Sequence, residues 1–275
     1  MQMTTKADSG RFQNGADKYA TYLETPEGRL RCDLAFANLQ DFLPLPRTNP
    51  SLRALDLGGG TGAATVRLAR LGIHTTLLDS SPAMLEIAKR AAHEAGITDK
   101  VVLQRGDAAH LTSLFNTAAF DVILCHNVLE YLDDPIAVLR GAARALRDSS
   151  AILSVLVRNR SGEVFKAAIQ TGDLAAAEIA LTSDWGQESL YGGPVRLFTP
   201  DSLQAMLKAA SMTMIAERGV RVLVDYLPPQ VSRREEYERI SELERKLGTR
   251  PEFAAIARYI QIIVRHSSSN EEAGP

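Results

Sequence analysis

The chain has 275 residues, of which 45% are hydrophobic, and a formal net charge of −2. This composition is typical of a globular protein with a full core and excludes a strongly basic nucleic-acid-binding domain, although a local basic patch stays compatible with it. Cys32 and Cys125 lack the spacing of metal ligands, and no apolar run reaches the roughly 20 residues of a membrane span. We therefore expect a cytoplasmic protein with reduced thiols, no bound metal and no membrane contact.

The first 50 residues are interpreted as an N-terminal helical cap, and residues 51–275 as the main domain. Residues 1 to about 18 are polar and mixed and predict a disordered or loosely packed start. Residues 19–43 have the apolar spacing of one helix, which prolines end. A helix ahead of the first strand can cover a ligand cleft. The candidates to face a ligand from this helix are Tyr19, Tyr22, Arg29 and Arg31.

The main domain opens on a strand, a glycine-rich turn and a helix. Residues 54–57 form a short apolar run, residues 58–62 contain four glycines, and apolar residues then recur with helical spacing as far as Leu71. This is the opening of a nucleotide-binding βαβ unit. Glycine there lets the backbone approach a ligand, and the start of the helix attracts anionic groups.

Strand and helix patterns alternate from here to residue 157. The predicted strands cover residues 75–78, 101–104, 120–125 and 151–157, and the predicted helices cover residues 82–95 and 133–146. This alternation favours an α/β fold with a Rossmann-like, doubly wound sheet of seven mostly parallel strands and helices on both faces. Asp107 follows the third strand, where it would accept from an adenine amino group or cap a turn.

Residues 158–197 break the alternation. They are too long for a plain connector, and we interpret them as an inserted helical lid over the substrate site. Beyond them, the pattern predicts helices over residues 199–210 and 232–247, strands over residues 212–216, 220–224 and 258–264, and a polar tail after His266. The helix over 232–247 interleaves Glu and Arg. This predicts a solvated helix held by i,i+4 ion pairs, with an RNA-binding face as the alternative.

Two acidic residues narrow the range of ligands that the glycine turn is expected to bind. The turn fits the loose dinucleotide pattern, but Asp56 precedes its first glycine by two residues and Asp79 ends the next predicted strand. Asp56-x-Gly58-x-Gly60-x-Gly62 with this second acid resembles motif I and the acidic loop of the class I S-adenosylmethionine-dependent methyltransferases. A nicotinamide cofactor and a turn that binds nothing stay open as alternatives.

A narrower resemblance rests on residues 28–31, 55–60, 122–131, 219–227 and 257–260. These segments resemble the bacterial tRNA 5-carboxymethoxyuridine methyltransferases, which methylate the carboxylate of that nucleoside at the tRNA wobble position. The resemblance implies S-adenosylmethionine as cofactor, S-adenosylhomocysteine as product and tRNA as partner, and it is consistent with a homodimer. Residues 158–197 match poorly, which leaves a small acidic acceptor as the alternative partner.

The resemblance also implies roles for single residues. Arg31 would meet the carboxylate of the cofactor, Asp79 its ribose and His126 its methionine end. These roles suit a guanidinium fork and a carboxylate with two acceptor oxygens. The expected cofactor-binding residues are Arg31, Asp56, Gly58, Gly59, Gly60, Asp79, Ser80, Asp107, Ala108 and His126.

A carboxylate acceptor determines the expected mechanism. It is already ionised near pH 7, so methyl transfer to its oxygen needs no general base and rests on in-line alignment and desolvation. Its charge needs cations or hydrogen-bond donors, and an RNA base must be splayed out and stacked. The substrate-binding candidates are Arg158, Arg160, Arg196, Arg221, Tyr191 and Tyr226. The candidates for a catalytic role are Arg158, Tyr226 and His126, the last as a base for a hydroxyl acceptor.

The sequence thus predicts a methyltransferase that acts on an oxygen, with a carboxylate in tRNA as the first candidate acceptor. Two alternatives stay open. One is O- or C-methylation of a small molecule such as a quinone, a polyketide or a natural-product acid. The other is non-catalytic binding of S-adenosylmethionine or S-adenosylhomocysteine.

Overall fold

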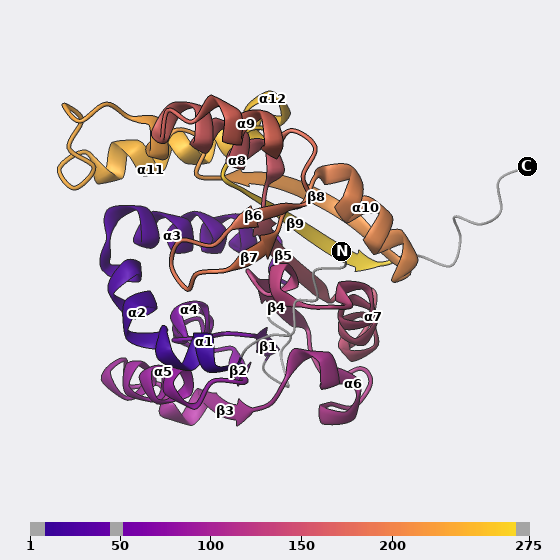
Figure 1. The fold of residues 1–275 in the computed structure, drawn as a ribbon. Coiled ribbons are helices and arrows are strands. Elements are labelled where there is room, and N and C mark those ends of the chain that lie inside the picture. The colour runs from indigo at the N-terminus through magenta and orange to yellow at the C-terminus, as the bar shows by residue number, and fades with distance from the viewer. Residues whose placement is uncertain (1–8, 45–51, 268–275) are drawn as a thin grey trace, which may run out of the picture.

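A computed structural model describes residues 9–44 and 52–267. A seven-stranded sheet of order β3-β2-β1-β4-β5-β9-β8 forms its centre, and helices cover both faces (Figure 1). The strands of this sheet are β1 Arg53–Leu57, β2 His74–Asp79, β3 Val101–Arg105, β4 Val122–His126, β5 Ile152–Arg158, β8 Met212–Val220 and β9 Tyr259–His266. The helices are α1 Ser9–Asn14, α2 Ala16–Glu24, α3 Pro26–Gln40, α4 Ala63–Arg70, α5 Pro82–Glu94, α6 Leu111–Leu114, α7 Pro135–Ala145, α8 Arg160–Phe165, α9 Leu174–Ala180, α10 Pro200–Ala209, α11 Tyr237–Gly248 and α12 Pro251–Ala254.

The sheet confirms the predicted Rossmann-like fold. Strands β1 to β5 pair in parallel, and β9 inserts antiparallel between β5 and β8. The strand order reverses at β1, which lies between β2 and β4, and ligands bind outside the carboxyl ends of strands at such a point. Asp79, His126 and Arg158, the last residues of β2, β4 and β5, therefore share one edge of the sheet.

The two faces of β4 pack into two hydrophobic layers. Ile123 lies in the core shared with α7 and α10, whereas Val122 packs with Leu39 of α3 and Leu68 of α4. Successive strand residues point to opposite faces, so one apolar run serves both layers. These side chains are fully buried, which fixes the position of His126 at the end of the strand.

The start of the described chain is more ordered than the sequence predicts. Residues 9–14 form α1, and Phe12 packs edge-on against Tyr131 and Tyr191, with ring centroids 5.1 Å apart in both pairs. The prediction of a loosely packed start is wrong for this helix, because an aromatic anchor holds it to distant parts of the chain. Residues 1–8 lie outside the described residues.

The helix predicted over residues 19–43 is two helices. Thr25 has extended backbone and ends α2, and its hydroxyl accepts from Gly28 N (3.1 Å) at the start of α3. Pro26 occupies the first turn of α3, where its missing N–H is not needed. Most of the predicted linker before β1, residues 45–51, lies outside the described residues.

The strand predicted over residues 220–224 is wrong. β8 ends at Val220, and Arg221, with φ of +63°, turns the chain into the short helical turn η5, Val224–Tyr226. The buried carboxylate of Glu244, on α11, holds this turn by accepting from Val222 N (2.6 Å) and from the next two backbone N–H groups (3.0 and 2.8 Å). Local sequence patterns could not predict this contact, because Val222 and Glu244 are 22 positions apart in the sequence.

The charged helix predicted over residues 232–247 is α11, and it begins later, at Tyr237. An exposed i,i+4 pair joins Lys246 to Glu242 (2.6 Å), as predicted. Burial of Glu244 shows that the helix is not solvated all round. The predicted polar tail lies almost wholly outside the described residues, which end at residue 267.

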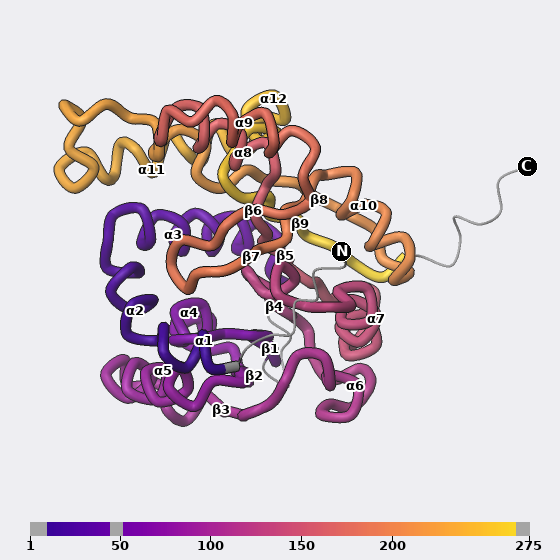
Figure 2. Tube along the Cα trace, in the orientation of Figure 1, coloured from indigo at the N-terminus to yellow at the C-terminus, as the bar shows by residue number. Residues whose placement is uncertain are grey.

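The lid segment, residues 158–197, contains α8, a π-helical turn η4 (Lys166–Gln170), α9 and a two-stranded sheet of β6 (Trp185–Gln187) and β7 (Pro194–Arg196). Figure 2 shows the loop between β6 and β7 reaching towards α1 and α2. Its Tyr191 ring packs against Phe12 (5.1 Å) and Tyr19 (6.0 Å). None of the helices within residues 9–44 and 52–267 is long and apolar enough to cross a membrane.

Candidate active site

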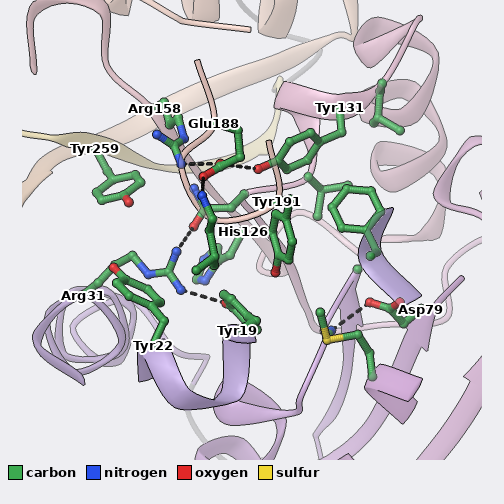
Figure 3. A pocket seen from close by; sticks show the side chains of 18 of the residues that line it. Tyr19, Tyr22, Arg31, Asp79, His126, Tyr131, Arg158, Glu188, Tyr191 and Tyr259 are labelled. Carbon is green, nitrogen blue, oxygen red and sulfur yellow. Dashed lines mark hydrogen bonds and ion pairs between the residues drawn. The ribbon is translucent and has the colours of Figure 1, made fainter. Parts of the chain in front are cut away.

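A cavity of about 380 Å³ lies at the carboxyl ends of β1, β2, β4 and β5. This volume is in the range of small-ligand sites. Residues of α1, α2 and α3, residues 188–191 of the lid segment and the turn after β8 complete its lining. Figure 3 shows Asp79 on one side of the cavity and Arg158 with Tyr259 on the opposite side.

The glycine turn after β1 faces the cavity because backbone hydrogen bonds hold it against β2. Gly58 N donates to Leu78 O (2.8 Å), and Gly60 N donates to Asp79 Oδ2 (2.9 Å). Gly58 has φ of +66°, and a Cβ added there would lie 2.5 Å from Val128 Cγ2. Only glycine fits such a position, so bare backbone faces the ligand.

Asp79 uses both carboxylate oxygens to shape the loop. Oδ1 accepts from Ser81 N (2.8 Å) and Oδ2 from Gly60 N (2.9 Å). Burial raises the pKa of Asp79, although the backbone donors counteract part of this rise. Each oxygen keeps a further lone pair, which suits the two hydroxyls of a ribose. Ser80, the next residue, also lines the cavity.

Asp107 and Ala108 line the cavity after β3. Asp107 Oδ1 accepts from Ala109 N (2.9 Å) and so caps a short helical turn, η2 (Ala108–His110). Its Oδ2 has no partner within the described parts of the chain. Both sequence interpretations of Asp107, a turn cap and an acceptor for a ligand amino group, are therefore compatible with this geometry.

Asp56 lies beneath the glycine turn and not on the main cavity. It is 3% exposed and accepts from Thr65 Oγ1 (2.7 Å). Burial raises the pKa of Asp56 to about 6. A Cβ on Gly59 would lie 2.8 Å from this carboxylate, so Asp56 supports the turn from below. Asp56 and Gly59 instead line a smaller adjoining pocket of about 60 Å³, together with Arg31.

Arg31 is a buried guanidinium without a carboxylate partner among the described residues. It is 7% exposed, and it donates through Nη1 to Asn127 Oδ1 (3.1 Å) and through Nη2 to Tyr19 Oη (2.7 Å). Its Cζ lies 5.2 Å from the ring centroid of Tyr22 and 5.8 Å from that of Tyr259. Burial alone would lower the pKa of Arg31, but these tyrosines raise it. A buried cation of this kind needs an anion, which a ligand carboxylate can supply.

His126 is a neutral side chain in this site. Its Nε2 lies 2.8 Å from Ser154 Oγ, on the neighbouring strand β5. Burial and then the charge of Arg31 lower the pKa of His126 to about 3. An imidazole with this pKa is a weak base near neutral pH. The lowered pKa therefore disfavours the predicted role of His126 as a base for a hydroxyl acceptor.

Three more arginines, besides Arg31, surround Tyr259 and line the cavity with it. We call Arg158, Arg221, Arg258 and Tyr259 the basic end. Each arginine has one acidic partner, and these ion pairs are Arg158–Glu188, Arg221–Asp225 and Arg258–Glu163. Burial raises the pKa of Tyr259, but the surrounding guanidinium groups outweigh burial and lower it to about 8.

The structure brings some of the predicted substrate residues to the cavity and leaves others outside its lining. Arg158, Arg221 and Tyr191 line it. Arg196 lies over the ring of Trp185 (5.3 Å), away from the cavity lining. Tyr226 turns away because η5 directs its neighbour Asp225 inwards, and its Oη lies 3.4 Å from Gly162 O. Arg160 pairs with Asp184 outside the lining.

Sequence reasoning missed several cavity residues. They are Phe12, Asn127, Tyr131, Lys166, Glu188 and Tyr259. Asn127 and Tyr259 lie in segments that carried the resemblance, so their proximity to the strand ends was a usable signal. Phe12 and Glu188 lie in segments without periodicity, and only the folded chain places them.

Comparison with known proteins indicates the kind of enzyme that this chain resembles. A family profile described as "Methyltransferase domain" matches residues 55–154. The tRNA 5-carboxymethoxyuridine methyltransferase of Escherichia coli K12 is 29% identical over 269 residues, which cover 95% of this chain and 98% of the relative. The ubiquinone biosynthesis O-methyltransferase of Hahella chejuensis is 26% identical over 181 residues, 66% of this chain and 71% of the relative. The solved structure of the CcbJ methyltransferase from Streptomyces caelestis has the same fold, with a TM-score of 0.61 and 17% identity over 95% of this chain and 100% of that one. These findings support the identification of this chain as an S-adenosylmethionine-dependent methyltransferase.

Proposed function

We propose that this methyltransferase transfers a methyl group to a carboxylate oxygen, and that its acceptor is 5-carboxymethoxyuridine at the wobble position of tRNA. The match to the E. coli tRNA 5-carboxymethoxyuridine methyltransferase along 95% of the chain supports this acceptor. The observation that carries the proposal is the basic end, because three buried guanidinium groups share one cavity with the glycine turn. An anionic acceptor suits this environment, whereas a neutral one does not exploit it.

The residues present fit S-adenosylmethionine. The bare backbone at Gly58 leaves room for a ligand, Asp79 offers lone pairs to ribose hydroxyls, and Arg31 is a buried cation without an acidic partner. We assign the cofactor carboxylate to Arg31 and the ribose to Asp79. When bound, the cofactor supplies a methyl group on a sulfonium, and it leaves as S-adenosylhomocysteine after the carbon–sulfur bond breaks with its electron pair on sulfur.

The chain contributes alignment of the reactants and an apolar wall beside them. A carboxylate is ionised near pH 7, so no residue has to remove a proton before its oxygen bonds to the methyl carbon. This agrees with the neutral, weakly basic His126. Phe12, Tyr131 and Tyr191 pack together in the cavity lining and give it an apolar wall. The carboxylate and the sulfonium carry opposite charges, and both charges are lost when the methyl group is transferred. Removing water from around these groups therefore favours the reaction.

The second candidate is methylation of a small acidic molecule. The same aromatic packing favours it, because the loop of residues 188–191 covers the cavity and leaves less room for a nucleotide within a folded RNA. The similarity to a ubiquinone biosynthesis O-methyltransferase over 66% of the chain supports a small acceptor too.

Nucleoside analysis of tRNA tests the proposal. Deletion of the gene in its source organism should remove the methyl ester from wobble 5-carboxymethoxyuridine, and the purified protein with S-adenosylmethionine should restore it in tRNA from the deletion strain. An unchanged methyl ester in the deletion strain would exclude the tRNA acceptor and leave the small acid.

A further inference from the structure

Strands β5 and β9 place two cavity residues directly opposite each other. The register of this antiparallel pair aligns Arg158, the last residue of β5, with Tyr259, the first residue of β9. Directly opposite residues of an antiparallel pair project from the same face of the sheet, with Cβ atoms about 5 Å apart. Both side chains line the cavity.

Arg158 has one buried nitrogen without a partner. The residue is 8% exposed, and Nη2 donates to Glu188 Oε2, whereas Nη1 has no hydrogen-bond partner among the described residues. A buried donor that is left unpaired is costly, especially on a charged group. Arg158 Nη1 is therefore available to donate a hydrogen bond to a bound ligand.

Tyr259 presents a second donor, a hydroxyl on a residue that lines the same cavity. The residue is 4% exposed, and its hydroxyl makes no hydrogen bond to any residue in the described parts of the chain. With a pKa of about 8, the phenol is mostly protonated at neutral pH and can donate. The charged and titratable groups that face this phenol are Arg31, Arg158, Arg221, Arg258 and Tyr22.

We propose that Arg158 Nη1 and Tyr259 Oη form a two-donor subsite that selects an acceptor carboxylate by binding one of its oxygens. The inference rests on the proposed function and names the residues that select the acceptor. The second oxygen stays free to bond to the methyl carbon. A neutral analogue would leave both donors unpaired, and buried polar groups discriminate strongly against such analogues.

Glu188 is the positioning residue of this subsite. Its Oε2 accepts from Arg158 and from Tyr131 Oη (2.9 Å), and its Oε1 accepts from Leu190 N (2.8 Å). With these partners its negative charge is satisfied, and the guanidinium is held with Nη1 unoccupied. Because Glu188 lies in the lid segment, the subsite is complete only when that segment covers the cavity.

The test uses the full chain loaded with S-adenosylhomocysteine and measures the binding of phenoxyacetate by calorimetry. Phenoxyacetate carries an oxyacetate arm on an aromatic ring, and phenoxyethanol is its neutral counterpart. We expect the wild-type protein to prefer phenoxyacetate, and Tyr259→Phe and Arg158→Lys to weaken its binding by roughly tenfold or more, the cost of a lost bond to a charged group. Tyr237→Phe is the matched control, because its hydroxyl bonds Asp33 (2.6 Å) outside the cavity lining.

Three results would overturn the inference. One is equal binding of the two probes by the wild-type protein. Another is the same phenoxyacetate affinity in Tyr259→Phe as in Tyr237→Phe. The third is an equal loss of affinity for S-adenosylhomocysteine itself in Tyr259→Phe and Arg158→Lys, which would assign these donors to the cofactor carboxylate. Failure of the proposed tRNA function would be distinguishable from these results. In that case the wild-type protein would still prefer phenoxyacetate but would not methylate tRNA.

Discussion

Replacing Arg31 by methionine tests the assignment of the cofactor carboxylate. Arg31 is already desolvated and oriented, by Asn127, Tyr19 and the rings around it, so a carboxylate gains hydrogen bonds without much reorganisation. Hydrogen bonds to a charged group contribute about 1.5–3 kcal/mol each. Loss of a bidentate contact should therefore weaken S-adenosylhomocysteine binding by about 3 kcal/mol, which is roughly a hundredfold in Kd.

Two controls make this prediction specific. Methylthioadenosine lacks the amino-carboxylate part of the cofactor, so its affinity should be nearly the same in Arg31→Met and in the wild-type protein. Arg29→Met removes an arginine from the same helix whose side chain is 62% exposed and pairs with Asp33 (3.5 Å). It should leave both affinities unchanged. Calorimetry with both ligands gives the result, and equal losses for the two ligands in Arg31→Met would refute the carboxylate assignment.

Three further predictions concern the glycine turn and the buried titratable groups. Gly58→Ala places a Cβ 2.5 Å from Val128 and should abolish measurable cofactor binding, whereas Gly72→Ala, at φ of +83° with nothing within 4 Å, should only reduce the free energy of unfolding by about 1–2 kcal/mol. Asp56→Asn should raise the free energy of unfolding at pH 7.5, by up to about 3 kcal/mol. In the folded protein the pKa of Asp56 is raised from its ordinary value of 3.8 to about 6. The protonated side chain therefore stabilises the fold in full below pH 3.8, and this stabilisation is lost as the pH rises through 6. Urea unfolding should therefore give no gain at pH 3.5. His126, whose pKa is lowered to about 3, stays neutral in the folded protein while the unfolded chain takes up a proton below pH 6.5. Stability is thus lost as the pH falls from 6.5 towards 3, and His126→Gln should reduce this loss in thermal melts at pH 7 and pH 4.5.

Local sequence patterns were sufficient for strands β1 to β5 and for the cavity residues at the carboxyl ends of β1 and β2. The alternating apolar runs specify β1 to β5, and Gly58 and Asp79 are contiguous with strands whose carboxyl ends must meet at one edge. The predicted site residues there depend only on short-range features, a turn and the end of a strand. This is why Gly60 N lies within hydrogen-bond distance (2.9 Å) of Asp79 Oδ2.

The basic end depends on long-range pairing that no local pattern contains. Tyr259 reaches Arg158 only because β9 inserts beside β5 in one particular register. Arg221 lies in the cavity because Glu244, more than twenty positions later, holds the turn that follows it. The apolar run after residue 219 looks like a strand in isolation, and the buried carboxylate overrides that propensity.

The insertion of β9 between β5 and β8 also bears on biosynthesis. A ribosome-bound chain that has emerged only as far as α11 already contains the glycine turn, Asp79 and Arg31, yet β5 and β8 still have unpaired edges. Such edges invite association with other nascent chains until the missing strand arrives. The basic end of the cavity is therefore completed last, at the moment when the final strand of the sheet brings Tyr259 beside Arg158.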